Sequence, residues 1–519
     1  MSDNQMPGNW QPNPQGPQGP VHQQGNPQQF GPQGQPPQPQ GQQYPPQQGY
    51  APQGYAPQGQ QAPVKKKSRT PIIVAAVVAV ALVVGGGFLA FALLGGSTPA
   101  AAKGLPADSL AAVELNLNPS AGQKLAVKDF AEKFPELASE VGDVEGDYKK
   151  ALWELIPDSE DKPDYDTEIK PWLGDSLALA ILDVEAEEFV VSVQVTDEDA
   201  ARAFAEAEFE GSSVEFIDDL MIVSEADAPA DVEAIRSASL ADDETYTADM
   251  AKLGADHLVT AWASEEFINQ AIEASEGEVG IETAGFSAHG AAGIKISDGM
   301  AVLRGVSLSS QEIGDAELAG DFVSSLPAGG LGVLASAFSA ESIDLLWQQL
   351  QPMYEQDPSM FDAFGVSSAD DLGAVVGNQL ALTFGWQGEE PQIGIKVSTD
   401  DPAKHQEVLE TIASGIGIPG VQHSTDGDTV HTTWGMSPDE LANPAETLGD
   451  NEAFGDVTET SGDTQSVLWV DVPALLSNEA LGLGNSEEAK YLEPISGVGI
   501  SGSTLDDGYA EFFVRVGTK

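Results

Sequence analysis

The sequence predicts an α+β protein with a disordered N-terminal tail, one transmembrane helix and two tandem duplicated modules, each an antiparallel sheet with packed helices. Three observations support this prediction. A long apolar run near the N-terminus carries no charge, and turn signals separate short apolar segments further along the chain. Most of these segments also recur about two hundred residues later, in the same order.

The first segment is a tail, residues 1–64, in which Gln, Pro and Gly occupy 45 of the 64 positions. Such a segment has too little apolar surface to offset the entropy that is lost on ordering. We therefore expect the tail to be disordered.

A transmembrane helix is predicted over residues 71–95, where the stretch from Ile72 to Leu94 holds 23 residues and no charge. This run forms about 34 Å of helix, enough to cross a hydrocarbon core of about 30 Å. A cleaved signal peptide ending near Ala100 is the alternative. The apolar run is too long for one, and a long tail precedes it.

The charges on either side of this run predict its orientation. Four cations precede it in the juxtamembrane segment 65–70, and Lys103 follows it in the linker 96–104. The positive-inside rule then predicts a single-pass plasma-membrane protein with a cytoplasmic N-terminus and an extracytoplasmic bulk. The four cations are expected to contact anionic lipid of the inner leaflet; they are Lys65, Lys66, Lys67 and Arg69.

Acidic residues dominate the part that follows the span. One acid and five bases precede Gly104, which leaves 81 acids and 17 bases after it. Such a surface repels phosphate backbones, so we expect no nucleic-acid partner. A solvated surface is the favoured interpretation of the acidity, and attraction for divalent cations or basic peptides is the alternative. The absence of cysteine excludes disulfides, thiolate metal sites and cysteine nucleophiles.

The recurrence predicts a duplication. "LPADSLAAVELN" at Leu105 returns as "LPAGGLGVLASA" at Leu326, and "LGDSLALAIL" at Leu173 returns as "VGNQLALTFG" at Val376. Seven such matches keep one order, with shifts from 194 to 221 residues. We therefore expect module 1 over residues 105–320 and module 2 over residues 326–519.

Within each module, helices and tight turns have local signals. A helix is expected after Thr196 or Asp197, and its counterpart begins with an Asp401 cap and Pro402. Hairpins are expected at the two Asp-Gly pairs that separate apolar runs, Asp298-Gly299 and Asp507-Gly508. These signals predict an antiparallel sheet with helices against one face.

The tail, the single span and the segment "LPADSLAAVELNLNPSAGQKLAVKDFAEKFP" from Leu105 resemble actinobacterial membrane-anchored proteins catalogued as a domain of unknown function. The resemblance covers the extracytoplasmic part and rests mainly on this opening segment. It implies an actinobacterial cell envelope. It carries over no activity and no site residues.

Two motifs match catalytic or cofactor patterns only in their letters. "GIGIPG" at Gly415 fits a dinucleotide fingerprint, but it follows a helical segment where the fingerprint needs a strand. "GFSAHG" at Gly285 places Ser287 as in a nucleophile elbow, but His289 stands where glycine is required. We interpret the first as a helix end with a loop and the second as a loop that enters a strand.

The best metal candidate is "HSTDGDTVH", with two imidazoles and two carboxylates around one turn: His423, Asp426, Asp428 and His431. A two-residue Asp426-Gly427 turn would pair His423 with Val430, which places the two histidines on opposite faces. Only a three-residue loop would pair them. We therefore expect a polar hairpin and no metal.

These arguments assign no catalytic, cofactor or metal site. The function expected is that of a non-catalytic binding or scaffolding protein of the cell envelope, with an envelope protein, a glycan or a lipid as partner. A membrane-tethered carrier of an apolar ligand such as lipid is the alternative. An envelope hydrolase is the third interpretation.

Overall fold

The computed structural model describes residues 100–519 except 136–137, 139–145, 157–161, 185, 272–286, 311–313, 315, 363–364, 388–389, 416–419, 460–462, 486–488 and 506. The predicted tail, juxtamembrane segment, transmembrane helix and most of the linker lie outside this part. None of the helices in the described part is long and apolar enough to cross a membrane.

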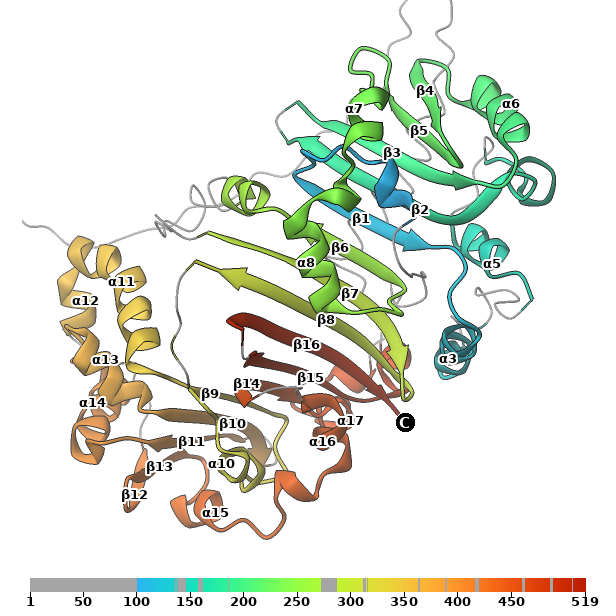
Figure 1. The fold of residues 1–519 in the computed structure, drawn as a ribbon. Helices are drawn as coiled ribbons and strands as arrows, with labels where there is room; N and C mark the ends of the chain where they lie inside the picture. The colour runs from blue at the N-terminus through green and yellow to red at the C-terminus, as the bar shows by residue number, and fades with distance from the viewer. Residues whose placement is uncertain are drawn as a thin grey trace, which may run out of the picture. The chain divides into compact units, whose positions relative to one another are not determined.

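One antiparallel sheet of sixteen strands runs through the described residues (Figure 1). Strands of the first half are β1 (Ala111–Asn116), β2 (Leu173–Asp183), β3 (Glu188–Val195), β4 (Ser212–Ile217), β5 (Leu220–Glu225), β6 (Val259–Ala263), β7 (Ala288–Ser297) and β8 (Met300–Ser309). Strands of the second half are β9 (Gly332–Ala337), β10 (Gln379–Gln387), β11 (Glu390–Ser398), β12 (Gln422–Asp426), β13 (Thr429–Trp434), β14 (Asp463–Val470), β15 (Ile495–Thr504) and β16 (Tyr509–Thr518).

Helices connect these strands. Those of the first half are η1 (Ala101–Gly104), α3 (Ala121–Ala131), α5 (Tyr148–Leu155), η2 (Tyr165–Ile169), α6 (Glu198–Glu208), α7 (Val232–Ser237), η3 (Leu240–Asp242) and α8 (Glu244–Leu253). Those of the second half are α10 (Gly320–Ser324), α11 (Ala340–Gln356), α12 (Pro358–Asp362), α13 (Ala369–Val376), α14 (Pro402–Gly415), α15 (Pro438–Ala442), η4 (Leu448–Asp450), α16 (Glu452–Thr458), α17 (Val472–Ser477), η5 (Leu483–Asn485) and α18 (Ala489–Leu492).

The two halves have the same strand order. From one edge inward, the first half reads β4-β5-β3-β2-β1-β6-β7-β8, and the second reads β12-β13-β11-β10-β9-β14-β15-β16 from the other edge. An isolated bridge joins Pro106 to Ser239 in the first half, and another joins Pro327 to Thr447 at the matching place in the second.

The sheets of the two halves are joined, which the prediction of tandem modules did not include. β8 pairs with β16, and Arg304 lies opposite Phe513 at the centre of this seam. Each of these strands would otherwise be the open edge of an eight-stranded sheet, with unpaired backbone groups. Pairing the two edges satisfies those groups and makes one continuous sheet.

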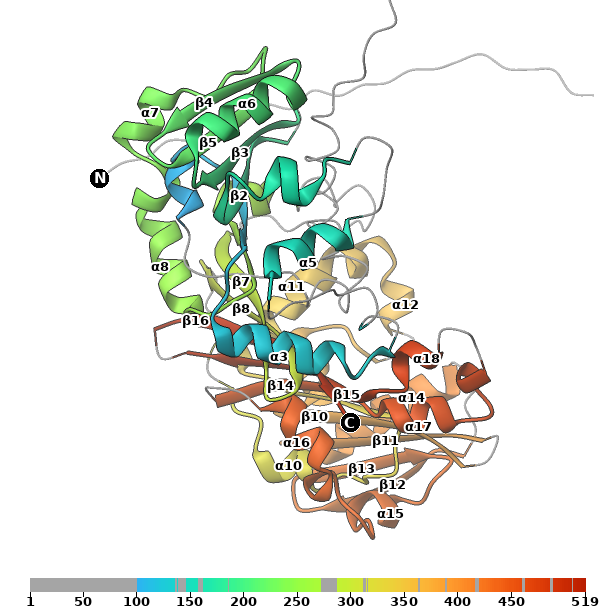
Figure 2. The same ribbon diagram turned by 90° about the vertical axis from the view of Figure 1, so that its right-hand side faces the viewer.

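Helices cover both faces of this sheet, whereas the sequence patterns predicted one covered face. Figure 2 shows α3 and α8 on either side of β7 and β8. Strand β5 illustrates the cause, because Ile222 packs in one core cluster and its neighbours Met221 and Val223 pack in another. A strand buried on both faces has no polar face to mark the solvent side.

Local signals placed two helix starts correctly. Asp197 caps α6 by accepting a 3.0 Å hydrogen bond from the Ala200 amide. Asp401 precedes Pro402 at the start of α14 and accepts a 3.0 Å hydrogen bond from the Lys404 amide. Both caps confirm the predicted helix starts.

The tight turns were predicted less uniformly. Asp298 and Gly299 have φ of 52° and 75° and form a two-residue turn between β7 and β8, as predicted. The second hairpin also forms at its Asp-Gly pair, with the Gly508 amide donating a 2.9 Å hydrogen bond to the Leu505 oxygen, but its loop is longer than two residues.

Candidate functional site

Helix α8 positions the candidate site. It begins after Asp243, whose side chain accepts a 2.8 Å hydrogen bond from the Tyr246 amide, and it packs on β6, β7 and β8. Tyr246 and Asp249 lie three residues apart, so both face the sheet. Asp249 is fully buried and Tyr246 is 2% exposed.

Asp249 is the centre of a polar cluster that four elements build. It accepts hydrogen bonds from Trp262 Nε1 on β6 at 2.9 Å and from the Tyr509 hydroxyl on β16 at 2.8 Å. His289 on β7 is the third partner, with its Nδ1 2.8 Å from Asp249 Oδ2. A buried carboxylate is tolerated only with such partners, so this cluster is a built feature of the core.

A second buried carboxyl adjoins the cluster. Glu114 on β1 accepts a hydrogen bond from the Tyr246 hydroxyl, and its Oε2 has no hydrogen-bond partner in the described residues. Burial raises the pKa of Glu114 to about 7. The hydrogen bond from Tyr246 lowers this pKa, but the effect of burial is larger. Burial also raises the pKa of Tyr246. Glu114 therefore changes charge near neutral pH.

A pocket of about 440 Å³ lies beside these groups; we call it the α8 pocket. Tyr246 and Met250 of α8 line it, together with Thr260 of β6 and His257 of the preceding loop. Neither ring nitrogen of the buried His257 has a hydrogen-bond partner in the part of the chain that the structure describes. Burial, reinforced by Lys295 and Arg304, lowers the pKa of His257 to about 4, so its ring is neutral at pH 7.

Sheet registers identify the matching positions of the second half. Trp262 pairs with Ala112 and Ala291, and Trp469 pairs with Val333 and Gly499. Helices α8 and α16 also match, because Asn451 caps α16 at the Phe454 amide as Asp243 caps α8 at Tyr246. The ring contacts are alike: Tyr246 with Trp262 and Phe454 with Trp469 each have centroids 5.6 Å apart, edge to face.

At those matching positions the second half is apolar. Ala335 stands for Glu114, Phe454 for Tyr246, Val457 for Asp249 and Gly497 for His289, and Met300 packs there where Tyr509 packs in the first half. Trp469 Nε1 has no hydrogen-bond partner among the described residues, whereas Trp262 Nε1 has Asp249. The same packing therefore forms without the polar groups, so the fold does not require them.

The hairpin that holds the weak metal candidate forms with a different turn. Asp426 pairs with Thr429, so the turn residues are Gly427 and Asp428, and His423 pairs with Thr432 instead of Val430. The change in register is two residues, which leaves His423 and His431 on opposite faces.

The side chains of this hairpin have separate environments. His423 Nδ1 lies 2.8 Å from Thr432 Oγ1, and burial lowers the pKa of His423 and of His431. Within the described ranges, no group of three or more His, Asp and Glu residues is arranged to hold a metal ion.

The glycine-rich segment at Gly415, the segment around Ser287 and two helical tryptophans have only packing or loop roles where the structure describes them. α14 ends at Gly415, and residues 416–419 of the fingerprint-like segment lie outside the described residues. Ser287 precedes β7, as expected for a loop that enters a strand. Trp153 and Trp347 pack in helical layers, Trp153 with Nε1 3.2 Å from the Pro163 oxygen and Trp347 with its ring 5.5 Å from Tyr354.

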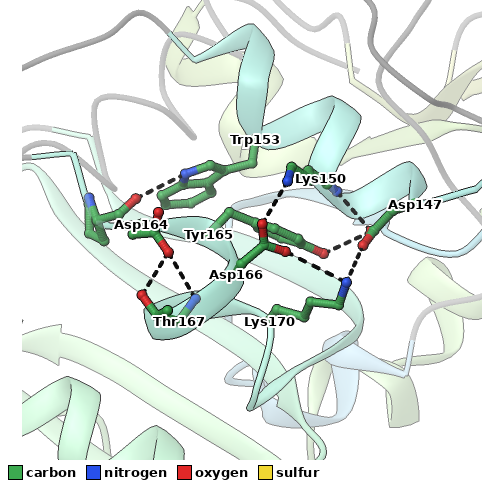
Figure 3. A network of polar contacts seen from close by, with 9 residues as sticks. Asp147, Lys150, Trp153, Asp164, Tyr165, Asp166, Thr167 and Lys170 are labelled. Carbon is green, nitrogen blue, oxygen red and sulfur yellow. Dashed lines mark hydrogen bonds and ion pairs between the residues drawn. The ribbon is translucent and has the colours of Figure 1, made fainter.

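A polar network around α5 and η2 is a second cluster of charged groups (Figure 3). Asp147 accepts hydrogen bonds from the Tyr165 hydroxyl at 2.9 Å and from Lys170 Nζ at 2.7 Å, and Lys150 Nζ lies 2.6 Å from Asp166. Burial raises the pKa of Asp147, but these hydrogen bonds outweigh it and hold the pKa below its usual value. Each of these charged groups lies beside a group of opposite charge at the surface, and the ion pairs link η2 to α5.

Sequence reasoning missed most of the α8 site. His289 was considered only as the residue that spoils a nucleophile elbow, and Glu114, Asp249 and Tyr509 had no motif. The usable signal was the difference between the repeated segments: "ETYTADM" at Glu244 carries Tyr and Asp where "EAFGDVT" at Glu452 carries Phe and Val.

Fold and site together define an α+β protein whose first half holds the polar cluster around Asp249 and the α8 pocket, while the matching positions of the second half are apolar. Residues 72–287 match the model of a family described as "Protein of unknown function (DUF3352)". The match is consistent with the resemblance to a domain of unknown function and spans β1 to β6 with α8, but not β7 or β16. No curated protein and no solved structure matches the chain.

Proposed function

We propose that the chain is a non-catalytic binding or scaffolding protein of an actinobacterial cell envelope, anchored by the span at residues 71–95, with the α8 pocket as its ligand site. The observation that carries this proposal is the contrast between the halves. Buried polar groups cost stability unless they serve packing or function, and the apolar residues at the matching positions of the second half support a role other than packing.

We further propose that the halves, residues 105–320 and 326–519, arose by duplication and then diverged. Their common strand order and matching cap positions support this proposal. In this view the second half keeps the original packing, and the first half acquired the pocket.

Binding is favoured over catalysis by the contacts of His289. In the described part of the chain, Nδ1 of its ring is hydrogen-bonded to Asp249, and Nε2 has no serine, threonine or cysteine partner. A nucleophilic mechanism needs a hydroxyl or thiol within hydrogen-bond reach of the imidazole that activates it. Asp249 instead holds the ring through Nδ1, and the Tyr509 ring packs against it edge to face, with centroids 6.4 Å apart.

Native mass spectrometry of the full-length chain, purified from its own membranes, tests the ligand site. Wild type should retain a small molecule. The triple variant Glu114→Ala, Tyr246→Phe, Asp249→Val, which carries the residues of the second half, should lose it and still fold. Glu215→Ala on the exposed face of β4 is the matched control and should retain the molecule. Equal retention in the triple variant would contradict the proposal.

The membrane arrangement has its own test. Protease added outside intact cells should digest residues 100–519 and spare the tail and the four juxtamembrane cations. Digestion of the tail alone would reverse the proposed topology.

A carrier of an apolar ligand such as lipid is the second candidate, and a different surface favours it. Leu334, Phe384, Ile500 and Phe512 are each about 40% exposed and point from β9, β10, β15 and β16 to the same face. Lipid recovered with wild type and lost after Phe512→Ser, but kept in the triple variant, would favour the carrier.

A further inference from the structure

We propose that the second half binds one hydrocarbon chain of a membrane lipid along an open face of the sheet, with the end of the chain in a cavity under α14. This inference rests on the carrier function proposed above as the second candidate, and it adds the ligand class and the placement of the ligand. It does not involve the α8 pocket. The side chains of the face, the cavity beside it and the comparison with the first half carry it.

Three rows of directly paired residues cross β10, β9, β14, β15, β16 and β8 on one side of the sheet; we call them the uncharged face. The central row has an apolar residue on every strand: Leu382, Leu334, Leu468, Ile500, Val514 and Leu303. The rows through Phe384 and Phe512, on either side of it, hold only glycine, serine and apolar residues. Because 20% of the residues in this chain are charged, a face of this size without one charge is unlike the rest of its surface.

Solvent reaches the uncharged face, although helices cover the other side of the same strands. Leu334 and Ile500 in the central row are 41% and 40% exposed. Phe384 and Phe512, which flank this row, are 42% and 40% exposed. On the opposite side, Val333 of β9 packs in a buried cluster with residues of α10, α15 and α16. Apolar side chains that are exposed together mark a surface for an apolar partner.

A cavity of about 120 Å³ adjoins the uncharged face. Helix α14 lines one side of it, and Ile393 and Ile395 of β11 line the other. Ile393 lies opposite Phe384 and Ile395 lies opposite Leu382, so the β11 side of the cavity continues the face. None of the residues that line it is charged. An apolar cavity of roughly 150 Å³ admits a molecule as large as benzene, so this one has room for the last few carbons of a chain.

The first half shows why the second half has this cavity. There, Phe204 of α6 packs on the sheet in one cluster with Leu179 of β2, which is 4% exposed. Val408 of α14 takes the place of Phe204, because each lies two turns after its helix cap. Val408 packs with α11 and α13 instead of the sheet. The space that an aromatic ring fills under α6 is therefore open under α14.

A hydrocarbon chain fits this surface better than a protein does. The side chains of the central row offer no hydrogen-bond donor or acceptor, whereas a protein partner brings backbone and charged groups that need them. A second copy of the chain is a poor partner as well, because the net charge of -60 makes two copies repel each other.

The proposed span supplies the source of the hydrocarbon chain. Residues 96–100 connect this span to η1 and extend over at most about 18 Å. Helix η1 packs on β3, so so short a connection holds the sheet beside the bilayer. Membrane lipids are then the hydrocarbon chains within its reach.

Photolabelling of the full-length chain tests this placement. The chain is reconstituted in phosphatidylcholine vesicles that contain phosphatidylcholine with a diazirine either at the last carbon or in the middle of one acyl chain. After irradiation, peptide mass spectrometry should find the terminal label on α14 or β11 and the mid-chain label on β9, β10, β15 or β16. Label confined to the span at residues 71–95 would overturn the inference.

Two variants block the site without removing a core residue. Ala413→Phe fills the cavity from α14 and should lose the terminal label, while Ala403→Phe at an exposed position of the same helix should keep it. Ile500→Asp places a charge in the central row and should lose both labels. Val184→Asp, at an exposed position outside the face, should keep both. Unchanged terminal label in Ala413→Phe, or unchanged mid-chain label in Ile500→Asp, contradicts the placement of the chain.

These outcomes are separate from those that decide the proposed functions. If lipid is recovered with wild type and lost after Phe512→Ser, but no label falls on these elements, the carrier function stands and the placement is wrong. The triple variant changes the opposite face of the first half and should keep both labels. Loss of the labels in that variant would show that the lipid depends on the α8 pocket, against this inference.

Discussion

The hydroxyl group of Tyr246 marks the difference between the halves, because Phe454 occupies the same place beside Trp469 without one. In the first half this hydroxyl is hydrogen-bonded to Glu114, and in the second half Ala335 requires no donor. The two polar residues thus depend on each other: a buried carboxyl group at residue 114 needs a donor, and a hydroxyl at residue 246 needs an acceptor.

Glu114 should make stability depend on pH near neutrality. Its pKa is 4.5 as a free group and about 7 in the folded protein, so the folded state holds the proton more tightly. Its contribution is then complete below the unfolded pKa and is lost as pH rises to the folded value. Glu114→Gln should match wild type near pH 4.5 and exceed it by on the order of 3 kcal/mol at pH 8.

Urea unfolding of both proteins at the two pH values, without ligand, checks this prediction. Glu215→Gln serves as control. The Glu215 carboxyl group is exposed, so this variant should have the same free energy of unfolding as wild type at both pH values. If the free energies of unfolding of Glu114→Gln and wild type differ by the same amount at both pH values, Glu114 does not titrate in this range.

Helices and turns were predictable where their signals are local. The Asp197 cap of α6 and the Asp298-Gly299 turn depend on residues adjacent in sequence, and both were confirmed. The turn of the β12–β13 hairpin was misplaced, because "DGD" allows Asp426-Gly427 or Gly427-Asp428 and tertiary packing selects between them. Local sequence fixes that a hairpin forms but not always its register.

Gly299 offers a test of turn geometry. It has a φ of 75°, and a Cβ there would have ample room, with Thr518 Oγ1 3.8 Å away. Gly299→Ala should therefore lower the free energy of unfolding by about 1 kcal/mol through backbone strain alone. Gly320→Ala at the start of α10 also meets no atom within 4 Å and should instead raise it by about 0.5 kcal/mol.

Denaturant unfolding of the two glycine variants in parallel checks this prediction. The opposite signs are the diagnostic result, because both changes add the same methyl group. Two losses of similar size would show that the space around each glycine decides the outcome and that the turn conformation does not.

The union of the halves into one sheet was beyond sequence reasoning. Strands β8 and β16 pair over about two hundred intervening residues, and neither carries a mark of its partner. Part of the α8 site was hidden for the same reason, since Tyr509 on β16 reaches Asp249 only through this pairing, whereas Glu114, Tyr246 and His289 belong to the first half. Spacing motifs cannot report contacts that the final topology creates.

The seam should depend on one buried ion pair. Arg304 of β8 lies 2.6 Å from Glu511 of β16, and the Glu511 side chain is fully buried. Glu511→Leu leaves the guanidinium without this carboxylate, so we expect a loss of about 3 kcal/mol in the free energy of unfolding. The double variant Arg304→Met, Glu511→Leu should recover much of the loss, which urea unfolding would measure. A single variant as stable as wild type would contradict this role.

The position of β16 has a consequence for biosynthesis. Of all the described strands, β16 leaves the ribosome last, yet it supplies the neighbour of β8 and the Tyr509 hydroxyl that reaches Asp249. Until that moment the first half is a sheet with an open edge and a buried aspartate that lacks one donor. Completion of the polar cluster around Asp249 thus waits for the last strand, and a nascent chain that stalls before it exposes an edge that other chains can pair with.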